Sequence, residues 1–459
     1  MSSDWISGLR ELLGKKVSIL PETLERYSRD ETSHLEAMPE AVVFAEKTED
    51  VAKLLKYANK HKLPVTPRGT GTGVSGGALP VKGGILLTLE RMDRILEIDT
   101  DNRMVVVQPG VITGELHKAV EEKDLFYPPD PASLESCSIG GNVIEGAGGP
   151  RAVKYGTTKD YVTGLEFVTA QGDVIRTGGK LRKDVTGYNL TGIMIASEGT
   201  LGVVTEITLK LLPLPRVRTD LLVPFESFKQ AAHTINEILK TGITPVVIEF
   251  MERRALEIVE AYLDSKLPVP GAGAYLMLGL DGQDKETVEA DYERVGEVCL
   301  ENGAVDVFVA ETADMKARLW KTRRSQHDAL HHLSKEMERE DVVVPVAQIE
   351  DLLLGVEKIR DRSKVEVVAF GHAGDGNVHV NILRGKLDKE SWETERKKIL
   401  DELLKLVISL GGTLSGEHGI GLVKKEFMPL VTSPAELELY KRLKKAFDPL
   451  GILNPGKIF

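Results

Sequence analysis

The sequence predicts an α+β protein made of two regions of different character. In the first region, glycine clusters at residues 69–84 and 140–156 among short strand-like and helix-like segments. In the second region, which follows the stiff segment 211–215, amphipathic helices alternate with apolar strands. That alternation is typical of an antiparallel sheet with helices covering one face. The 459 residues suffice for two or three domains, each with its own core.

Composition and charge exclude several classes of protein. The net charge of −11 argues against nucleic acid as a partner and against a polybasic membrane anchor. The two cysteines, Cys137 and Cys299, are too few for an iron–sulfur cluster or a zinc ribbon, and they fit a reducing compartment. The N-terminus lacks a signal-peptide pattern, and no apolar run reaches the roughly 20 residues needed to span a bilayer. We therefore expect a cytoplasmic protein without a membrane span.

Periodicity predicts the elements of the first region. Residues 5–62 are expected to form helices with short connections, including an amphipathic helix over 49–61 that Thr48 caps. Residues 113–120 predict another helix. Strands are expected where β-branched and apolar residues are concentrated, at 42–44, 85–89 and 104–108.

The first glycine-rich loop covers residues 68–76. Its Gly71, Gly73 and Gly76 match the formal pattern G-x-G-x-x-G. A Rossmann dinucleotide site requires a helix that begins inside this pattern, and the following residues 78–84 cannot form one. The sequence therefore excludes a Rossmann site here.

The same loop can still bind an anion. Consecutive backbone N–H groups form a nest that suits a pyrophosphate, with the Arg68 charge at its rim. Further glycine-rich loops are expected at 131–149 and 196–204. Three such loops suggest one large, flat, phosphate-bearing ligand that is touched at several points.

The second region alternates between the two element types. Helices are expected at residues 228–240, 253–262, 286–302, 314–337, 391–409 and 434–447. Strands are expected at 245–250, 274–280 and 306–309, and a further sheet segment begins at 342–345.

The segment 365–382 predicts a β-hairpin around which the second region is organised. Its Asp375 and Gly376 favour a two-residue turn, because a type I′ turn needs positive φ at both central positions. That register would place His372 opposite His379, with Cβ atoms about 4.5–5.5 Å apart. Two imidazoles at this separation can bind one metal ion, and we favour this over a pair of histidines that merely stack.

Several segments together resemble a known family, the FAD-linked 2-hydroxyacid dehydrogenases of the vanillyl-alcohol-oxidase superfamily. The matching segments occur in the family's order at residues 67–76, 139–142, 147–149, 154–156, 197–202, 372–381, 416–419 and 451–455. The resemblance implies a two-part FAD-binding domain of the vanillyl-alcohol-oxidase (PCMH) type and a cap domain. We expect the FAD-binding domain at 1–215, the substrate- and metal-binding cap at 216–420, and a C-terminal segment, 421–459, that returns to the FAD-binding domain.

The resemblance implies FAD that is bound non-covalently, because Thr72 stands where some relatives bond FAD through a histidine. Gly146 departs from the family pattern, in which Asn is common. The residues implied to bind FAD are Arg68, Gly69, Thr70, Gly71, Thr72, Gly73, Val74, Ser75, Pro131, Ile139, Gly140, Gly141, Asn142, Ala147, Gly148, Gly149, Tyr155, Gly156, Glu198, Gly199, Val204 and Asn454.

The resemblance also implies one divalent metal ion, for which zinc, manganese and iron stay open. Its ligands would be His372, His379 and Glu417. Adjacent side chains in extended backbone diverge, so we expect Glu417 to face the metal and His418 to act as the catalytic base.

The implied enzyme oxidises a D-2-hydroxy acid to the 2-oxo acid. In that reaction the metal lowers the hydroxyl pKa, His418 takes the proton, and a hydride passes to flavin N5. Arg323 matches the family's carboxylate-binding arginine, and Asn381 is expected to hydrogen-bond the substrate. His327 stands where D-2-hydroxyglutarate enzymes tend to carry Thr, whereas Arg339 could reach a second carboxylate. The substrate's length therefore stays open among D-lactate, which we favour, glycolate and D-2-hydroxyglutarate.

A flavin-dependent transferase similar to alkyldihydroxyacetonephosphate synthase is the alternative. The pair His331 and His332 resembles that enzyme's histidine-rich run, but the metal hairpin argues against it. For the dehydrogenase, the electron acceptor is expected to be a quinone, a cytochrome, an iron–sulfur subunit or an electron-transfer flavoprotein rather than NAD. A homodimer, and a peripheral position at a membrane through a redox partner, stay open.

Overall fold

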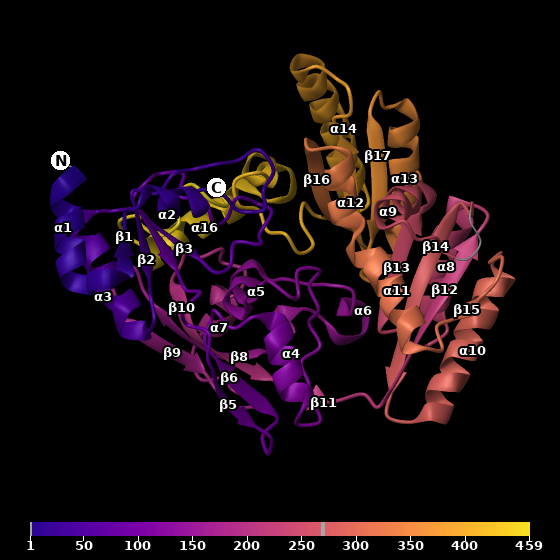
Figure 1. Cartoon of the computed structure of the whole chain (residues 1–459), viewed down its shortest axis with the longest axis horizontal. Helices are drawn as coiled ribbons and strands as arrows, with labels where there is room; N and C mark the ends of the chain where they lie inside the picture. Colours follow the sequence, from indigo (N-terminus) through magenta and orange to yellow (C-terminus); the bar gives the residue numbers. More distant parts are fainter. Residues whose placement is uncertain (1, 268–270) are drawn as a thin grey trace. The chain divides into compact units, whose positions relative to one another are not determined.

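The computed structural model describes residues 2–267 and 271–459, which divide into two compact units (Figure 1). Unit 1 contains the chain up to Gly148, Thr157–Leu214 and Glu417–Phe459, and unit 2 contains Gly149–Gly156 and Pro215–Gly416. The sequence did not indicate that residues 149–156 belong with the second unit. The functions expected for these regions stay predictions.

The first sheet of unit 1 is mostly parallel. Its strands lie in the order β1 (Val17–Ser18), β2 (Ala41–Phe44), β4 (Ile85–Thr88) and β3 (Val65–Arg68), with only β1 antiparallel to its neighbour. Helix α3 (Thr48–His61) connects β2 to β3 and buries a stripe with helical spacing, Val51, Leu54, Leu55 and Ala58.

The expected Thr48 cap of α3 is wrong. Thr48 lies inside the helix, and Lys47 at the N-cap makes no side-chain cap hydrogen bond. The Thr48 hydroxyl instead donates to Glu166 Oε1 at 2.6 Å. A tertiary contact has therefore replaced the local cap.

The second sheet of unit 1 is antiparallel throughout. Its strands lie in the order β5 (Ile95–Asp99), β6 (Met104–Val107), β10 (Val203–Lys210), β8 (Val162–Val168) and β9 (Val174–Gly178). A separate two-stranded pair joins β7 (Leu125–Phe126) to β11 (Leu212–Pro213). The remaining helices of unit 1 are α1 (Ser2–Leu13), α2 (Pro21–Arg26), α4 (Thr113–Glu121), α5 (Ile139–Glu145), α7 (Leu190–Met194), α15 (Met428–Val431) and α16 (Pro434–Phe447).

Part of the second glycine-rich block is a helix, α5, where the sequence predicted a loop. The hydroxyl of Ser138 caps it by accepting a backbone N–H of the first turn. Gly140 is required for packing, because a Cβ there would lie 2.8 Å from the carbonyl oxygen of Pro109. Gly146 ends the helix in the left-handed conformation at φ +76°, which is usual for Gly and also occurs with Asn at a helix C-terminus.

The C-terminal segment completes unit 1 (Figure 1, yellow). The N–H of Val65 donates to the carbonyl of Ile452 at 2.8 Å, and the N–H of Asn454 donates to the carbonyl of Val65 at 2.8 Å. The end of the chain therefore lies along the free edge of β3.

Unit 2 is built on one antiparallel sheet. Its strands lie in the order β15 (Phe308–Val309), β12 (Val217–Phe225), β14 (Ala274–Gly282), β13 (Val247–Glu252), β17 (Glu366–Gly371), β18 (Asn377–Leu383) and β16 (Met337–Val343). Helix α6 (Ala152–Tyr155) of the 149–156 segment also belongs to this unit.

Helices cover both faces of this sheet, so the expectation of one covered face is wrong. Leu221 and Val223 pack in one core with residues of α8 (Phe228–Lys240), α10 (Lys285–Glu301), α13 (Ile349–Arg362) and α14 (Lys389–Ser409). Leu222 between them packs in a second core with residues of α9 (Arg253–Leu263) and α12 (Gln326–Leu333). Neighbouring strand residues point to opposite faces, so both faces are apolar.

The single helix expected over residues 314–337 is also wrong. Helix α11 (Ala313–Arg324) ends at Ser325, α12 ends at Leu333, and the chain then enters β16. The charged residues at the start of β16 have good helix propensity, but pairing with β18 overrides it.

The expected hairpin exists, but its register is wrong. His379 lies opposite Phe370, not His372. A 3₁₀ turn (Ala373–Asp375) followed by Gly376 at φ +83° joins the strands, in place of a two-residue turn. The longer connection shifts the pairing by two residues.

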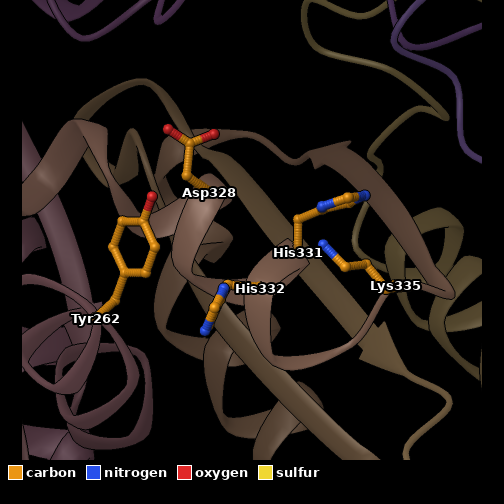
Figure 2. Close-up of a pocket in the computed structure, with 5 residues that line it drawn as sticks. All are labelled: Tyr262, Asp328, His331, His332 and Lys335. Atoms are coloured by element: carbon orange, nitrogen blue, oxygen red, sulfur yellow. The ribbon is translucent and has the colours of Figure 1, made fainter.

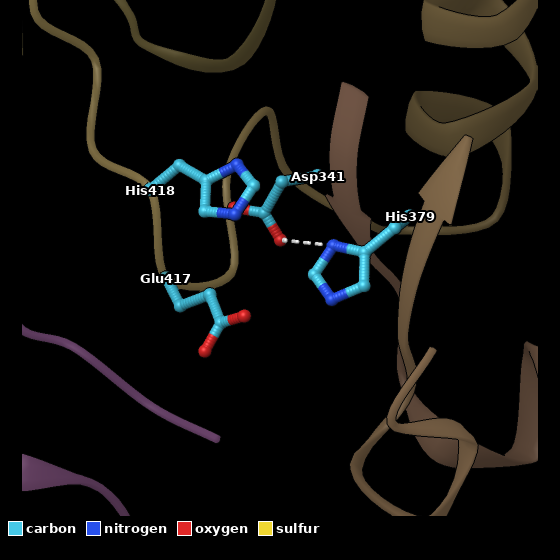
Figure 3. Close-up of side chains that lie close together, drawn as sticks. All are labelled: Asp341, His379, Glu417 and His418. Carbon is cyan, nitrogen blue, oxygen red and sulfur yellow. Dashed lines mark ion pairs between the residues drawn. The ribbon is translucent and has the colours of Figure 1, made fainter. Parts of the chain in front are cut away.

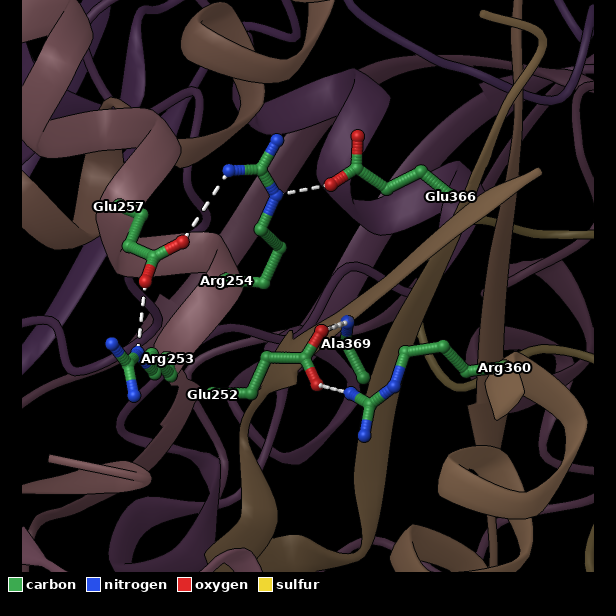
Figure 4. A network of polar contacts seen from close by, with 7 residues as sticks. All are labelled: Glu252, Arg253, Arg254, Glu257, Arg360, Glu366 and Ala369. Carbon is green, nitrogen blue, oxygen red and sulfur yellow. Dashed lines mark hydrogen bonds and ion pairs between the residues drawn. The ribbon is translucent and has the colours of Figure 1, made fainter. Parts of the chain in front are cut away.

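A network of charged residues links β13 to its neighbours (Figure 4). The buried Glu252 accepts hydrogen bonds from the N–H of Ala369 at 2.6 Å and from Arg360. Burial raises the pKa of Glu252 to about 7, because Arg360 and the Ala369 N–H offset only part of the desolvation.

No helix among the described residues is sufficiently long and apolar to cross a membrane.

We expect Glu252 to make unit 2 less stable as the pH rises from 5 to 8. Between the unfolded pKa of about 4.3 and the folded pKa of about 7, only the folded state holds the proton, so stability falls with pH through this window. Urea unfolding followed by tryptophan fluorescence should show a loss about 2–3 kcal/mol larger in the parent than in Glu252→Gln. The exposed neighbour Glu257→Gln is the matched control, and equal losses in parent and Glu252→Gln would contradict the assignment.

Candidate active site

The buried carboxylate of Glu249 lies at the centre of the candidate site in unit 2. It sits on β13, is 0% exposed, and pairs with Arg323 of α11 on one side. On the other side, its Oε1 lies 2.5 Å from Nδ1 of His372. Burial alone would raise the pKa of Glu249, but the charges of Arg323 and His372 outweigh it and lower the pKa to about 2. Glu249 is therefore an anion that holds two functional candidates in place.

A second buried carboxylate lies near His379, at a distance longer than a hydrogen bond. Asp341 on β16 is fully buried, and its Oδ1 lies 3.9 Å from Nδ1 of His379 on β18. The side-chain amide of Asn377 donates to the same Oδ1 at 2.6 Å. Oδ2 accepts from the Ser415 hydroxyl at 2.8 Å and from the Gly416 N–H at 3.0 Å. Both Asp341 oxygens are thus engaged by protein donors.

Glu417 and His418 follow Gly416 directly along the chain. Figure 3 draws them with Asp341 and His379, which belong to unit 2, whereas Glu417 and His418 belong to unit 1. The expected division of roles, with Glu417 facing a metal ion and His418 acting as base, stays a prediction. His372 is not opposite His379 in the hairpin.

His372 nevertheless lies beside His379. Their ring centroids are 5.1 Å apart and the rings are nearly perpendicular. The contact of His372 Nδ1 with Glu249 favours the tautomer whose lone pair is on Nε2, whereas the 3.9 Å separation of His379 from Asp341 fixes no tautomer. A carboxylate behind a histidine is the usual support of a metal-binding imidazole.

Arg323 and Asn381 lie in the same unit. The guanidinium of Arg323 is buried over the ring of Phe370, 5.1 Å from its centroid. Its Nη2 is buried and has no hydrogen-bond partner within the described part of the chain. Asn381 is buried on β18, two residues after His379, where its side chain donates to the carbonyl of Val368 at 3.4 Å.

The first glycine-rich loop of unit 1 is flanked by buried polar atoms. Arg68 is 8% exposed and donates to the carbonyl of Arg29 at 2.6 Å. Arg68 Nε and Ser75 Oγ are buried and lack hydrogen-bond partners among the residues described. Between β3 and β4 there is no helix, as the sequence predicted. These unsatisfied donors fit a polar ligand along the loop.

The remaining residues expected at the cofactor lie in both units. Tyr155 and Gly156 belong to unit 2, and the Tyr155 hydroxyl donates to the Asp281 carboxylate at 2.9 Å. Glu198 and Asn454 belong to unit 1, and the Asn454 side chain donates to the Glu198 carbonyl at 2.7 Å.

The pair His331 and His332 lies elsewhere, on the surface of α12. Together with Tyr262, Asp328 and Lys335 these histidines line an open surface hollow of about 230 Å³ (Figure 2). All five side chains are exposed, so this hollow lacks the buried polar groups of a built site.

Sequence reasoning missed Glu249 and Asp341. Glu249 is a lone carboxylate in the apolar run 246–250, which signals a buried charge with a distant partner. Asp341 follows Glu338, Arg339 and Glu340 in the sequence, so no such signal marks it.

Two family models match the chain. The model described as "FAD linked oxidases, C-terminal domain" matches residues 214–458. The model described as "FAD binding domain" matches residues 39–178.

Full-length relatives agree with these models. The glycolate oxidase subunit GlcD of Bacillus subtilis is 42% identical over 94% of this chain and 92% of its own length. A D-lactate dehydrogenase of Anaerostipes hadrus is 36% identical over 100% of this chain and 98% of its own. A D-2-hydroxyglutarate dehydrogenase of Stutzerimonas stutzeri is 34% identical over 97% and 96%, respectively.

Solved structures share the fold. p-Cresol methylhydroxylase matches with a TM-score of 0.82 at 20% identity, covering 99% of this chain and 96% of that chain. Alkyldihydroxyacetonephosphate synthase matches with a TM-score of 0.76 at 18% identity, covering 99% and 85%. At such low identity these likenesses show the fold alone.

We expect Glu249→Ala to destabilise unit 2 by about 3–5 kcal/mol, because it leaves the buried Arg323 guanidinium without its counter-ion. The matched control is Glu366→Ala, which removes the partner of Arg254 in a more exposed pair and should cost about 0–1 kcal/mol. Urea unfolding followed by the fluorescence of Trp320 and Trp392 compares the two variants. Similar losses in both would refute a special role of the Glu249 charge.

Proposed function

We propose that this chain, which belongs to the FAD-linked oxidases, oxidises a D-2-hydroxy acid to the 2-oxo acid. D-Lactate is the substrate that we favour. The chain is an FAD-dependent oxidoreductase. The names of its relatives, which act on glycolate, D-lactate and D-2-hydroxyglutarate, support this substrate class. The observation that carries the proposal is the buried Arg323, whose Nη2 is unsatisfied among the described residues, in the same unit as His372 and His379.

We assign FAD to the glycine-rich loop after β3 and to the helix α5 region in unit 1. The unsatisfied Arg68 Nε and Ser75 Oγ support a polar ligand there, and the backbone N–H groups of residues 69–75 suit its pyrophosphate. FAD, when bound, accepts the two electrons and the hydrogen that leave the substrate. Electrons then pass to an acceptor other than NAD.

We assign a divalent metal ion to His372 and His379 through their Nε2 atoms and to Glu417. Asp341 is less suited as a ligand, since its two oxygens already accept hydrogen bonds from Asn377, Ser415 and Gly416. A bound divalent ion lowers the pKa of a hydroxyl group that contacts it.

The remaining residues act on the substrate directly. Arg323 binds the substrate carboxylate through its unsatisfied Nη2, while Glu249 holds the guanidinium in position through Nε. His418 accepts the proton of the α-hydroxyl as general base. Asn381 donates a hydrogen bond that orients the substrate.

Anaerobic mixing with D-lactate should bleach the flavin absorption, because the reaction leaves reduced FAD when no acceptor is present. L-Lactate should not bleach it, and glycolate and D-2-hydroxyglutarate measured in parallel define the chain length that the site accepts. If none of these acids bleaches the flavin, the proposed reaction is wrong.

We expect His372→Ala to lose the metal but keep FAD, because the assigned FAD contacts lie in other elements. Elemental analysis measures the metal, and the visible absorption of oxidised flavin reports FAD. The matched controls are the surface variant His233→Ala, which should keep both, and His418→Asn, which should keep both but lose turnover. Metal that survives His372→Ala but not Asp341→Asn would transfer the ligand role to Asp341.

A further inference from the structure

The loop that carries Glu417 and His418 is held by one carboxylate of unit 1. Glu198 Oε1 accepts the N–H of Ile420 at 2.7 Å, and Oε2 accepts the N–H of Gly421 at 2.8 Å. Two successive N–H groups that converge on one anion form a nest. Glu198 itself is 5% exposed, so these bonds are shielded from water.

Hydrogen bonds from the C-terminal segment fix the position of Glu198. Its backbone has a left-handed φ of +50°, which is uncommon for a residue with a side chain. The Asn454 side chain donates to the Glu198 carbonyl at 2.7 Å and to the Gly77 carbonyl at 2.9 Å. Lys457 then donates to Asn454 Oδ1 at 3.0 Å. The strained residue is thus held by two buried side chains.

A second buried carboxylate, Glu145, lies against the same loop at Gly419. A Cβ on Gly419 would lie 2.5 Å from Glu145 Oε2 and 3.1 Å from Glu198 Oε1, so the two carboxylates flank the same glycine. The loop therefore has little room to move at Gly419. Burial and the neighbouring Glu198 charge raise the pKa of Glu145 well above its usual range.

We infer that Glu198 is a positioning residue, which orients Glu417 and His418 by binding the backbone that follows them. That they act on metal and substrate rests on the proposed function, but the hold of Glu198 on the loop does not. The inference assigns the Glu198 carboxylate to the loop, whereas the family resemblance assigns this residue to FAD.

Hydrogen–deuterium exchange tests this hold on the FAD-loaded protein. We expect amides in the peptide spanning residues 417–424 to exchange at least tenfold faster in Glu198→Ala, because both acceptors of the Ile420 and Gly421 amides are lost. Glu198→Gln keeps one acceptor oxygen and should be intermediate. Glu198→Gln also tests the inference if Glu198→Ala does not fold.

The matched control is Glu166→Gln in the same unit. Glu166 is as buried as Glu198, but its Oε1 accepts from Thr48 and Thr205. This variant should leave exchange in residues 417–424 unchanged. Unchanged exchange in both Glu198 variants would overturn the inference.

A second readout separates this inference from the proposed function. Titration with Mn²⁺, followed by electron paramagnetic resonance, should show at least tenfold weaker binding in Glu198→Gln than in Glu166→Gln. If the parent protein binds no Mn²⁺ while loop exchange still rises in the Glu198 variants, the proposed metal site fails and the loop assignment stands.

Discussion

The charge on Glu249 is the interaction on which the candidate site of unit 2 depends. A buried guanidinium and a buried imidazole are tolerable there because one carboxylate lies between them. The same carboxylate fixes two geometries at once. It holds the Arg323 guanidinium through Nε, and it favours the His372 tautomer whose lone pair is on Nε2. Substrate anchoring and metal binding, as we propose them, are therefore coupled through one side chain.

The class of fold and the cofactor could be predicted from the sequence. The α+β prediction, with a two-part FAD-binding domain of the vanillyl-alcohol-oxidase (PCMH) type and a cap, is confirmed, as are the expected FAD and the oxidoreductase class. The glycine spacing of 68–76 and the absence of a following helix sufficed to reject a Rossmann site. These signals are local, so they survive without tertiary information.

The hairpin shows where local signals fail. Asp375 and Gly376 favour a two-residue turn, but the Asn377 side chain binds Asp341 and the carbonyl of Val342 on the next strand. These contacts select a longer turn and move His379 opposite Phe370. Glu249 was missed for a related reason, because its partners lie 74 and 123 residues away along the chain. Periodicity reports burial but not the partner of a buried charge.

The pairing of β3 with the C-terminal segment has a consequence for how the protein is made. β3 is an edge strand of its sheet, and among the described residues Val65 pairs on its outer side with Ile452 and Asn454. The ribosome synthesises every residue of unit 2 before it synthesises Ile452 and Asn454. At about 5–20 residues per second, the edge of β3 stays open for roughly 20 seconds or more after it has been synthesised. During that time the nascent chain presents an unpaired strand that other chains can bind, and the last few residues remove this aggregation hazard.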